Sequence, residues 1–310
     1  MPISPLHIHS IANNSSNRFP HKIGFDLAGV VAAVGTSISN FKPGDEVYSR
    51  IPDDCKGSLA EYCLSTAAAT ALKPKTLSFS EAASIPLAGQ TALQALRRGE
   101  KELKDGLKGK TVFIPAGLSG TGGFAVQLAK NVFQAGKVIT TLSTGKIPKI
   151  KALLGEGTPD QIIDYTKEDI NKAVEERSVD FMFDPISSTL ASLHLMKKGG
   201  WIISVSTLPS GKLMKEKMLP HLPIVLKVIL DIADWLFTKL TSWKGVNYSY
   251  MHLEGNTADL DRLAKWVDEG KVRPVVGTQV RLEDIEGVRK GCQQIFEGKG
   301  GIGKMVVNIV

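Results

Sequence analysis

Cysteine is scarce in this chain of 310 residues, which contains only Cys55, Cys63 and Cys292. No two of them form a C-x-x-C pair, so the sequence offers neither a disulfide framework nor a cysteine cluster with the spacing of a zinc site. Small secreted domains usually depend on disulfides, whereas proteins of reducing compartments do not. We therefore expect a cytoplasmic protein without a bound metal.

A long uninterrupted apolar run is also missing. The most apolar stretch, from Leu219 to Leu240, is broken by prolines and charged residues, so it predicts no membrane span. Within it Lys227, Asp231, Asp234 and Thr238 recur every three or four residues, which places them on one narrow stripe of a helix. The rest of the circumference is apolar and requires cover. We favour packing on its own domain or at a dimer interface, with membrane contact as the alternative.

No long block of one charge sign occurs. The chain has 38 Lys and Arg residues against 31 Asp and Glu, a formal net charge of +7 and a pI near 9.2. Basic and acidic residues are interleaved, as between Arg97 and Lys110, which is typical of a solvated surface. A nucleic-acid partner is therefore not expected, although the positive charge suits an anionic cofactor.

The sequence does contain a glycine-rich turn between a short apolar run and an amphipathic pattern, in TVFIPAGLSGTGGFAVQLAK (Thr111 to Lys130). Small residues at such a place allow a dinucleotide pyrophosphate to approach the N–H groups at a helix N-terminus, where the partial positive charge is favourable. The spacing departs from a strict G-x-G-x-x-G, and an ordinary structural turn is the alternative. The residues expected to face the pyrophosphate are Ser119, Gly120, Thr121, Gly122 and Gly123.

The segments after this turn alternate between short apolar runs and helical patterns. This alternation is typical of a parallel sheet that helices cover on both faces, so we predict an α/β fold with a Rossmann-like, doubly wound sheet. Gly199 and Gly200 are expected to stop the last of these helices. The predicted strands are 137–142, 161–165, 179–184 and 201–206, and the predicted helices are 146–154, 167–176 and 189–197.

The end of the second predicted strand indicates which dinucleotide binds. NAD sites usually carry an Asp or Glu about 20 residues past the glycines, whereas a 2′-phosphate needs hydroxyls and a cation there. The stretch from Thr140 to Lys146 contains no acid. Ser143 and Lys146 therefore favour NADPH, unless Lys146 is only a solvated lysine.

Seven further segments accompany the turn: GFDLAGVVAAVG (24–35), FKPGDEVYS (41–49), GSLAEY (57–62), AASIPLAGQTALQAL (82–96), IIDYTKED (162–169), GKVRPVV (270–276) and GKMVV (303–307). In this order they make the chain resemble the medium-chain dehydrogenase/reductase superfamily, and within it the zinc-free, quinone-oxidoreductase-like branch. The resemblance covers most of the chain from Gly24 onward. It implies a GroES-like, β-rich catalytic domain formed by residues 1–90 and 272–310, and an inserted Rossmann NADPH-binding domain formed by residues 91–271.

The resemblance also implies roles for individual residues. Tyr165 would join Ser143 and Lys146 at the 2′-phosphate, and Thr91 would lie on the nicotinamide side of the cleft. Further residues, from two strand ends and from the last segment of the chain, would line or reach the cofactor: Asp184, Pro185, Val205, Ser206 and Lys304.

Two of these assignments, and that of the candidate proton donor, have plain structural alternatives. Tyr165 could be an ordinary strand-end aromatic, and Thr91 could cap the helix that starts there. Tyr62, in the GSLAEY segment, is the candidate catalytic proton donor, and a packed tyrosine would explain it equally well.

The resemblance bears on zinc and on the N-terminus. Zinc-dependent relatives carry a His ligand at the position of Phe25, and a phenyl ring cannot bind zinc. The stretch from Val47 to Gly57 is too short for the four-cysteine lobe of those enzymes, so we expect no bound metal. Family members also carry a longer segment before Gly24. We therefore expect a catalytic domain that is shortened and incomplete at the N-terminus.

The expected function is NADPH-dependent, zinc-independent reduction of a quinone or an α,β-unsaturated carbonyl by hydride transfer. The substrate would be a small hydrophobic molecule. A homodimer is expected through the strand-like segment from Asn247 to Leu253, because an edge strand can pair with its two-fold mate. One alternative is a stand-alone enoyl reductase or non-redox cyclase acting on a large hydrophobic substrate. Another is a catalytically silent NADPH-binding protein.

Overall fold

The computed structural model describes residues 22–52, 55, 57–298 and 301–309, so the expectation for the N-terminal segment lies outside the described residues apart from Lys22 and Ile23. The chain divides into two compact units. The terminal unit comprises the chain up to Thr91, Leu118–Phe124, and Glu254 to the end. The sheet unit comprises Ala92–Gly117 and Ala125–Leu253.

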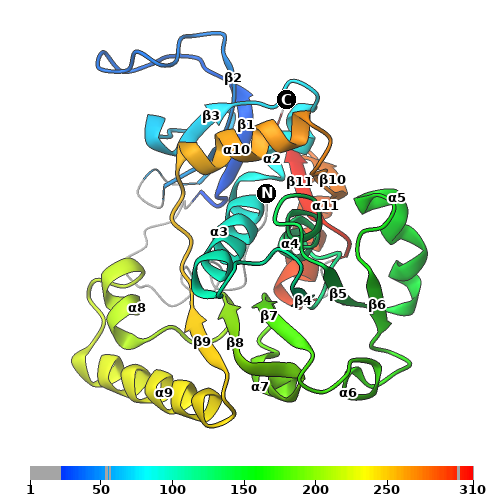
Figure 1. Cartoon of the computed structure of the whole chain (residues 1–310). Helices are drawn as coiled ribbons and strands as arrows, with labels where there is room; N and C mark the ends of the chain where they lie inside the picture. Colours follow the sequence, from blue (N-terminus) through cyan, green and yellow to red (C-terminus); the bar gives the residue numbers. More distant parts are fainter. Residues whose placement is uncertain (1–21, 53–54, 56, 299–300, 310) are drawn as a thin grey trace. The chain divides into compact units, whose positions relative to one another are not determined.

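Six parallel strands form the sheet of the sheet unit (Figure 1). Their spatial order is β6-β5-β4-β7-β8-β9, and each strand pairs in parallel with its neighbour. In this order the chain starts near the centre, moves to one edge and then fills the other, which is the arrangement of a doubly wound dinucleotide-binding fold. The predicted α/β fold with a Rossmann-like sheet is confirmed. The strands are β4 (Thr111–Ile114), β5 (Lys137–Leu142), β6 (Gln161–Asp164), β7 (Val179–Asp184), β8 (Met196–Ser204) and β9 (Asn247–Tyr250).

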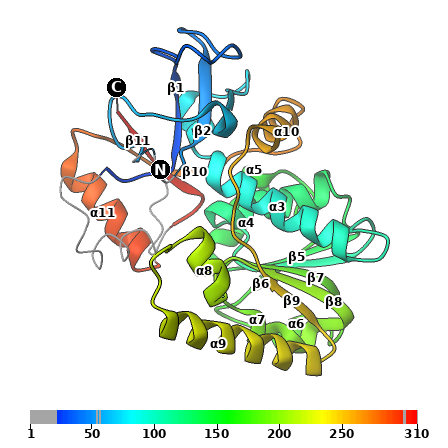
Figure 2. The same cartoon turned by 90° about the vertical axis from the view of Figure 1, so that its left-hand side faces the viewer.

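Helices cover both faces of this sheet. Figure 2 shows α4 (Gly120–Asn131) and α5 (Ile150–Leu154) on one side, and α6 (Ile170–Ala173) and α7 (Thr189–Ser192) on the other. α3 (Pro86–Glu102) precedes β4 in the chain, and α8 (Gly211–Lys217) and α9 (Ile224–Trp243) connect β8 to β9. Side chains from several strands fill the space between the sheet and its helices, among them Phe113, Ile139, Met182 and Ile202, each at most 1% exposed.

Three local expectations differ from the structure in detail. The segment 146–154 begins as a 3-10 helix, η3 (Thr144–Lys149), before α5 starts. The helix expected over 189–197 ends early: α7 gives way to the 3-10 helix η4 (Leu193–Leu195), and Met196 already opens β8, paired with Val179. Gly199 and Gly200 lie inside β8 instead of stopping a helix. The buried Met196 gains strand pairing and core contacts, so tertiary packing overrides local helical preference.

The helix expected over 167–176 is limited to α6. Asp169 caps it, since its carboxylate accepts a hydrogen bond from the backbone N–H of Asn171 at 2.9 Å. The residue after the helix, Val174, already has extended backbone angles and is buried. Burying Val174 in the core therefore ends the helix early.

The terminal unit contains two small sheets. β1 (Asp26–Val30), β2 (Glu46–Arg50) and β3 (Thr70–Leu72) are antiparallel, and β10 (Val276–Arg281) pairs in parallel with β11 (Lys304–Asn308). The fully buried Tyr48 of β2 donates a hydrogen bond to the carbonyl of Leu260, and burial raises the pKa of its phenol. The helices of this unit are α2 (Phe79–Ala83), α10 (Thr257–Asp268) and α11 (Ile285–Phe296), with the 3-10 helix η2 (Ala67–Ala69).

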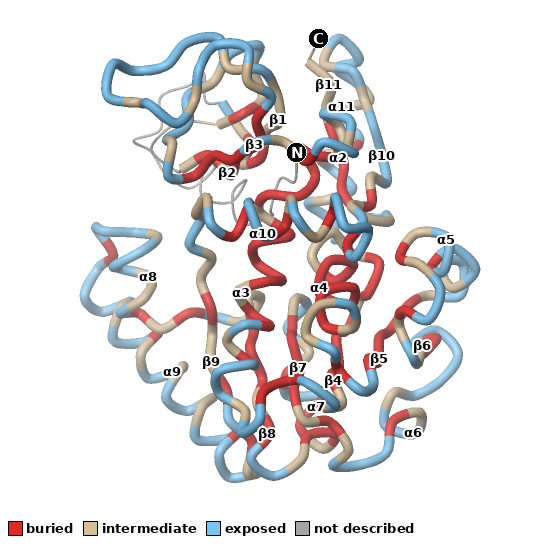
Figure 3. The backbone as a smooth tube through the Cα atoms, turned by 45° about the horizontal axis from the view of Figure 1, so that its top comes forward, coloured by how far each residue is buried: buried red, intermediate tan, exposed pale blue. Residues whose placement is uncertain are grey.

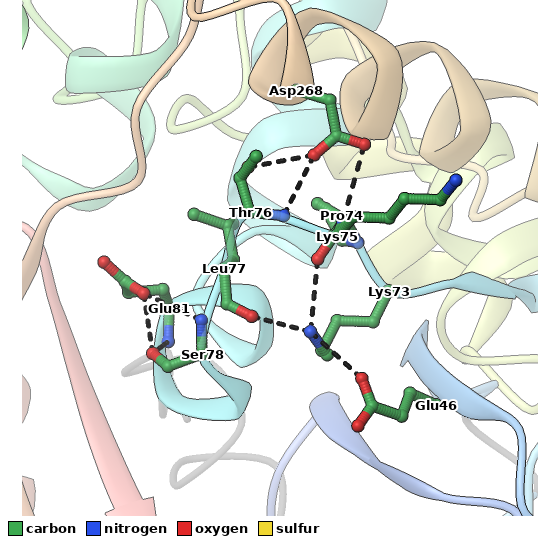
Figure 4. A network of polar contacts seen from close by, with 9 residues as sticks. All are labelled: Glu46, Lys73, Pro74, Lys75, Thr76, Leu77, Ser78, Glu81 and Asp268. Atoms are coloured by element: carbon green, nitrogen blue, oxygen red, sulfur yellow. Dashed lines mark hydrogen bonds and ion pairs between the residues drawn. The ribbon is translucent and has the colours of Figure 1, made fainter.

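A polar network joins the segment after β3 to α10 (Figure 4). Asp268 accepts hydrogen bonds from the N–H and the hydroxyl of Thr76, at 3.2 and 2.9 Å. The ammonium of Lys73 lies 3.2 Å from a Glu46 carboxylate oxygen and donates to the carbonyl of Leu77 at 2.6 Å. Residues from both ends of the chain are therefore fixed to one another. α10 lies inside the range 91–271 that was expected for the Rossmann domain, and its contacts are with this unit.

α9 packs the other way round from what its sequence suggested. Its polar stripe is turned toward the protein, since Lys227, Asp231, Asp234 and Thr238 are only partly exposed while most of its apolar residues are exposed. Figure 3 shows α9 mainly in the colours of exposed and intermediate residues. The expectation that α9 buries its apolar surface on its own domain was wrong. Among the helices of the described residues, none combines the length and the hydropathy that crossing a bilayer requires.

Candidate cofactor and active site

The turn after β4 is held by two threonines of β5. The hydroxyl of Thr140 donates to the carbonyl of Ile114 at 2.6 Å, and the N–H of Ala116 donates to the hydroxyl of Thr141 at 3.0 Å. A Cβ atom at Gly117 would lie 2.2 Å from the Thr140 hydroxyl oxygen. Ala116 itself has a φ of 56°, in the left-handed region. The turn thus requires a glycine because neighbouring polar side chains of the sheet approach it closely.

The start of α4 is organised by Ser119, whose hydroxyl accepts a hydrogen bond from the N–H of Gly122 at 3.0 Å. Such a cap satisfies one of the N–H groups that a helix start leaves without a partner. On one flank Gly303 runs parallel to Ser119, and its N–H donates to the carbonyl of Leu118 at 2.8 Å. The pairing of the last chain segment with the glycine turn gave no signal in the sequence.

The side chain of Lys304 lies against this turn, but its ammonium group pairs with Asp26. A Cβ atom at Gly120 would meet the Lys304 side chain at 2.6 Å, whereas its ammonium lies 3.3 Å from a carboxylate oxygen of Asp26. Asp26 also accepts a hydrogen bond from the N–H of Leu87 at 2.8 Å. Burial lowers the pKa of Lys304, and Asp26 opposes that shift. The ion pair is almost fully buried, and it fixes β11 to β1 beside the glycine turn.

Ser143, Lys146 and Tyr165 gather at the carboxyl ends of β5 and β6. The backbone carbonyl of Ser143 accepts a hydrogen bond from the N–H of Lys146 at 2.9 Å, and the N–H of Tyr165 donates to the carbonyl of Leu142 at 3.1 Å. Tyr165 is 55% exposed. The polar residues expected for a 2′-phosphate site therefore lie on neighbouring loops of one sheet edge.

Asp164, which was not among the expected site residues, ties these loops together. Its carboxylate accepts the hydroxyls of Thr144 at 2.5 Å and Thr166 at 2.6 Å. These hydrogen bonds hold the pKa of Asp164 below its ordinary value. An acid does lie close to this edge, but its side chain is buried and already accepts hydrogen bonds from both loops. The position at the end of a predicted strand was the signal that could have identified it.

The ends of β7 and β8 are joined by a second polar cluster. Asp184 is fully buried, and its carboxylate accepts hydrogen bonds from the N–H and hydroxyl of Thr189 at 2.8 and 2.6 Å. The Asp184 carbonyl accepts from the N–H of Val205 and from the hydroxyl of Ser206. Its carboxylate thus serves the turn into α7, while Pro185, Val205 and Ser206 lie half-buried at the strand ends.

The structure agrees neither with Thr91 as a helix cap nor with Tyr62 as a packed tyrosine. Thr91 lies within α3 and donates its hydroxyl to the carbonyl of Leu87 at 2.7 Å, so it does not cap a helix start. Tyr62 is 75% exposed, so it is not a packed core tyrosine. The alternative explanations of both residues were therefore wrong.

The position that holds a zinc ligand in zinc-dependent relatives does not suit a cation in this chain. The Arg50 guanidinium lies 5.0 Å from the centre of the Phe25 ring, so a positive charge already occupies its face. Within the part of the chain that the structure describes, no three His, Cys, Asp or Glu side chains are grouped as a metal site. Phe25 and the neighbouring Arg50 therefore do not fit the zinc site of the superfamily's metal-dependent members.

The candidate residues fall in both units. The terminal unit holds the glycine turn (Ser119, Gly120, Thr121, Gly122 and Gly123) with Tyr62, Thr91 and Lys304, and the sheet unit holds Ser143, Lys146, Tyr165, Asp184, Pro185, Val205 and Ser206. Within each unit the structure brings residues from distant segments together. In the sheet unit they follow strands β5 to β8 at the carboxyl edge, where open α/β sheets bind their ligands.

Two family models match the chain. Residues 3–86 match the alcohol dehydrogenase GroES-like domain, and residues 159–307 match a model described as zinc-binding dehydrogenase. Together with the sheet order, these matches confirm the predicted combination of a GroES-like domain with a Rossmann-like domain.

Named relatives and solved structures agree with this result. The chain is 38% identical over 186 residues to 2-methylene-furan-3-one reductase of Solanum lycopersicum, which covers 58% of this chain and 45% of that protein. It is 36% identical over 189 residues to the chloroplastic NADPH-dependent alkenal/one oxidoreductase of Arabidopsis thaliana, covering 59% and 46%. The aligned region thus spans about half the length of these curated relatives. The quinone oxidoreductase of Coxiella burnetii superposes with a TM-score of 0.72 at 27% identity, covering 98% of this chain and 83% of that one.

Proposed function

The chain belongs to the medium-chain dehydrogenase/reductase superfamily, and from this premise we propose that it is an NADPH-dependent, zinc-independent oxidoreductase that reduces a quinone or an α,β-unsaturated carbonyl. The observation that carries the proposal is the glycine turn between β4 and α4 at the centre of a doubly wound sheet. The named activities of the relatives, reduction of enones and quinones, support the substrate class.

The residues of the turn fit a nicotinamide dinucleotide. The helix start capped by Ser119 and the small residues up to Gly123 provide room and N–H groups for the pyrophosphate. The cofactor supplies the hydride when it is bound, and the protein binds and orients it and excludes water. The side chains proposed to hold the remaining parts of the cofactor are Thr91, Ser143, Lys146, Tyr165, Pro185, Val205 and Ser206, supported by Asp184 and Lys304. The two proposed domains are a GroES-like catalytic domain of residues 1–90 and 272–310 and a Rossmann NADPH-binding domain of residues 91–271.

Tyr62 is the proposed proton donor. Reduction of a conjugated carbonyl leaves an enolate that requires a proton, and a phenol can supply it. The exposure of Tyr62 leaves its hydroxyl accessible to a ligand. Replacement of Tyr62 by Phe should lower kcat for an enone while leaving NADPH affinity unchanged.

NADPH is preferred over NADH in this proposal because Lys146 would pair with the 2′-phosphate. A charge-assisted bond of about 1.5 to 3 kcal/mol corresponds to a roughly ten-fold or greater loss of NADPH affinity in Lys146→Ala, with NADH spared. Lys149, exposed on the same 3-10 helix, gives the matched control Lys149→Ala. Equal losses for both cofactors would reject the assignment.

The proposed reaction is tested by following NADPH oxidation with quinones, enones and enoyl thioesters as substrates. Turnover of simple quinones or enones supports the proposal, whereas turnover of enoyl thioesters alone points to an enoyl reductase. Tight NADPH binding without turnover of any of them identifies a silent binding protein. Metal analysis of the active protein should find no stoichiometric zinc, and chelators should leave its activity unchanged.

A homodimer through β9 is the proposed assembly. β9 pairs with β8 on one side and ends the order of strands among the described residues. The N–H of Met251 donates to Ser204 of β8, so alternation along the strand directs the N–H of Tyr250 to the outer edge. Tyr250→Pro removes that donor and should shift the protein toward monomer in light scattering. A monomeric wild type at micromolar concentration would contradict this assembly.

The cytoplasm is the proposed location. Cys55, Cys63 and Cys292 form no disulfide in the structure, and burial raises the pKa of Cys63 and of Cys292. Thiols with raised pKa values are protonated at neutral pH and react slowly. Fractionation of cells that express the tagged full-length protein would test the location.

A further inference from the structure

α9 exposes one continuous apolar face. At 3.6 residues per turn, the exposed apolar residues cover about 200° of the helix circumference. Trp235 is 58% exposed and Trp243 84%. Contiguous apolar patches of more than roughly a few hundred Å² mark interaction surfaces on soluble proteins. The members of this apolar face are Ile224, Val225, Leu226, Val228, Ile229, Ile232, Trp235, Leu236, Leu240 and Trp243.

The opposite face of α9 is fixed to the sheet unit by polar contacts. Asp231 accepts a hydrogen bond from the backbone N–H of Lys212 in α8 at 2.9 Å, and its carboxylate is held in place by an ion pair at 2.6 Å with Lys227, one turn earlier in α9. A Cβ atom at Gly211 would lie 2.0 Å from the carbonyl oxygen of Lys227, so α8 and α9 approach as closely as a glycine permits. α9 therefore cannot roll to bury its apolar face without breaking these contacts.

The core side of α9 also contains two buried residues and an aromatic contact. Leu230 and Thr241 are the buried positions of the helix, and the ring of Phe237 lies 4.7 Å from that of Tyr248 in β9. A polar cavity of about 320 Å³ opens beside Asp234 and Thr238. These contacts fix the direction in which the apolar face points, away from the sheet.

We propose that the apolar face of α9 docks onto the surface of an anionic lipid bilayer, with the helix lying flat in the interface. The exposed charged side chains from Gly211 to Lys244 have a nearly uniform sign: five lysines against Glu216. An apolar face flanked by lysines and carrying tryptophans is the pattern of helices that lie in the membrane interface. The exposed lysines are Lys212, Lys215, Lys217, Lys239 and Lys244.

Charge distinguishes a lipid surface from a second copy of the chain as the occupant. In a two-fold contact the same patch meets itself, so the lysines of one copy would approach those of the other. Anionic lipid headgroups instead complement them. Lys239 lies within the apolar arc, where its long stem can extend along the helix and place the ammonium among the headgroups.

The first test measures binding of the full chain to vesicles. Wild-type protein should co-sediment with phosphatidylcholine vesicles containing phosphatidylserine, and only weakly with pure phosphatidylcholine, with the difference shrinking as salt is raised. Lys215→Glu/Lys239→Glu/Lys244→Glu should weaken the phosphatidylserine binding about 100-fold, because each lysine near an anionic surface contributes about five-fold. The control Lys101→Glu/Lys104→Glu/Lys108→Glu changes the net charge equally at exposed positions on α3 and the segment after it and should bind as wild type.

The second test examines the apolar face. Trp235→Ala/Trp243→Ala should weaken vesicle binding at least roughly ten-fold, since both rings would leave the interface. Leu72→Ala/Leu190→Ala, at exposed positions elsewhere, is the matched control. In a Trp201→Phe/Trp266→Phe background, Trp235 and Trp243 are the remaining tryptophans, and brominated lipids should quench their fluorescence.

Several results would overturn the inference. Equal binding to both vesicle types, or equal weakening by the test and control variants, would exclude the docking face. If Trp235→Ala/Trp243→Ala converts a dimer to monomers in light scattering and no vesicle binding occurs, a second copy covers the face instead. None of these outcomes depends on the proposed reductase activity, because no assay uses a substrate.

Discussion

α4 and α9 are two apolar helices that connect strands of the same parallel sheet. The apolar residues of α4 are buried, whereas most of those of α9 are exposed. Along α4, the residues from Gly122 to Ala129 are all buried, and Phe124 and Leu128 are at most 2% exposed. Along the twenty residues of α9, Leu230 and Thr241 are the buried positions. An apolar composition therefore does not show by itself whether a helix contributes to a core or to a surface.

The polar residues of the two helices explain the difference. α4 has small residues and a hydroxyl cap at its start and almost no charge along its length, so every face can pack. The polar stripe of α9 carries charges at Lys227, Asp231 and Asp234. Asp231 pairs with Lys227 of the same helix and accepts a hydrogen bond from the backbone N–H of Lys212 in α8. Charged groups are costly to bury without partners. The partners are on the sheet side, and they direct the polar stripe inward.

The largest expected effect is the difference in stability between removing a buried leucine side chain from α4 and removing an exposed one from α9. Leu128→Ala in α4 should lower the free energy of unfolding by about 3 kcal/mol, since a fully buried side chain leaves a cavity. Leu236→Ala in α9 should change it by less than about 0.5 kcal/mol, because Leu236 is 54% exposed. Urea unfolding of both variants measures the contrast. Equal losses would mean that the apolar face of α9 is buried in solution.

The next effect concerns the turn that leads into α4. Gly117→Ala should cost about 2 kcal/mol, because the new methyl group would displace the Thr140 hydroxyl from its hydrogen bond to Ile114. Gly145→Ala is the control, since a Cβ atom there meets open space. Thermal unfolding should show a lower Tm for the first variant and an unchanged one for the second. A wild-type Tm for Gly117→Ala would show that the turn tolerates a side chain.

A smaller effect is expected where α8 and α9 meet. Asp231→Ala removes the partner of Lys227 and of the α8 backbone, so the Tm at neutral pH should fall by a few degrees. These hydrogen bonds hold the pKa of Asp231 below its ordinary value, so its contribution is present above that value and is lost as the pH falls through the lowered pKa. Wild type and variant should therefore converge in acid. A constant difference across pH would exclude the ion pair as the cause.

The smallest effect has the opposite sign. Burial, and then the charge of Asp231, raise the pKa of Asp234. A carboxyl group with a raised folded-state pKa favours folding below its ordinary pKa and opposes it as the pH rises through the raised value. Asp234→Asn should therefore stabilise the protein slightly at pH 7, and the gain should vanish in acid. Denaturant unfolding at both pH values measures it, and a loss of stability at pH 7 would show that the Asp234 charge is needed.

The pattern of apolar residues predicted a helix or strand correctly where the tertiary contacts of the segment agree with its local preference. β5 and β7 have the predicted bounds, because each is a short run of apolar and β-branched residues that is buried almost throughout. The helix expected at 189–197 ends early because Met196 pairs with Val179, a contact that requires the strand from another part of the chain. The glycine turn was predictable as a connection between a strand and a helix, since the apolar run, the small residues and the helical pattern follow one another along the chain.

The partners of Lys304 and Asp164 were not predictable. Lys304 and Asp26 are 278 positions apart, and their buried pairing beside the glycine turn depends on how the two chain ends meet. Asp164 joins two loops, and its role depends on hydroxyls of Thr144 and Thr166 that reach the same carboxylate. Neither the burial of a charge nor its partner is visible in residue types alone.

The sequence by itself determined the order of strands and helices, the glycine turn, and the narrow polar stripe of α9, because each depends on spacing along the chain. The tertiary structure decided which face of α9 points outward and which polar groups share a carboxylate. A periodic pattern defines two faces of a helix but carries no information on which one meets the protein. That choice depends on the partners that distant segments bring to each face, as α8 does for Asp231.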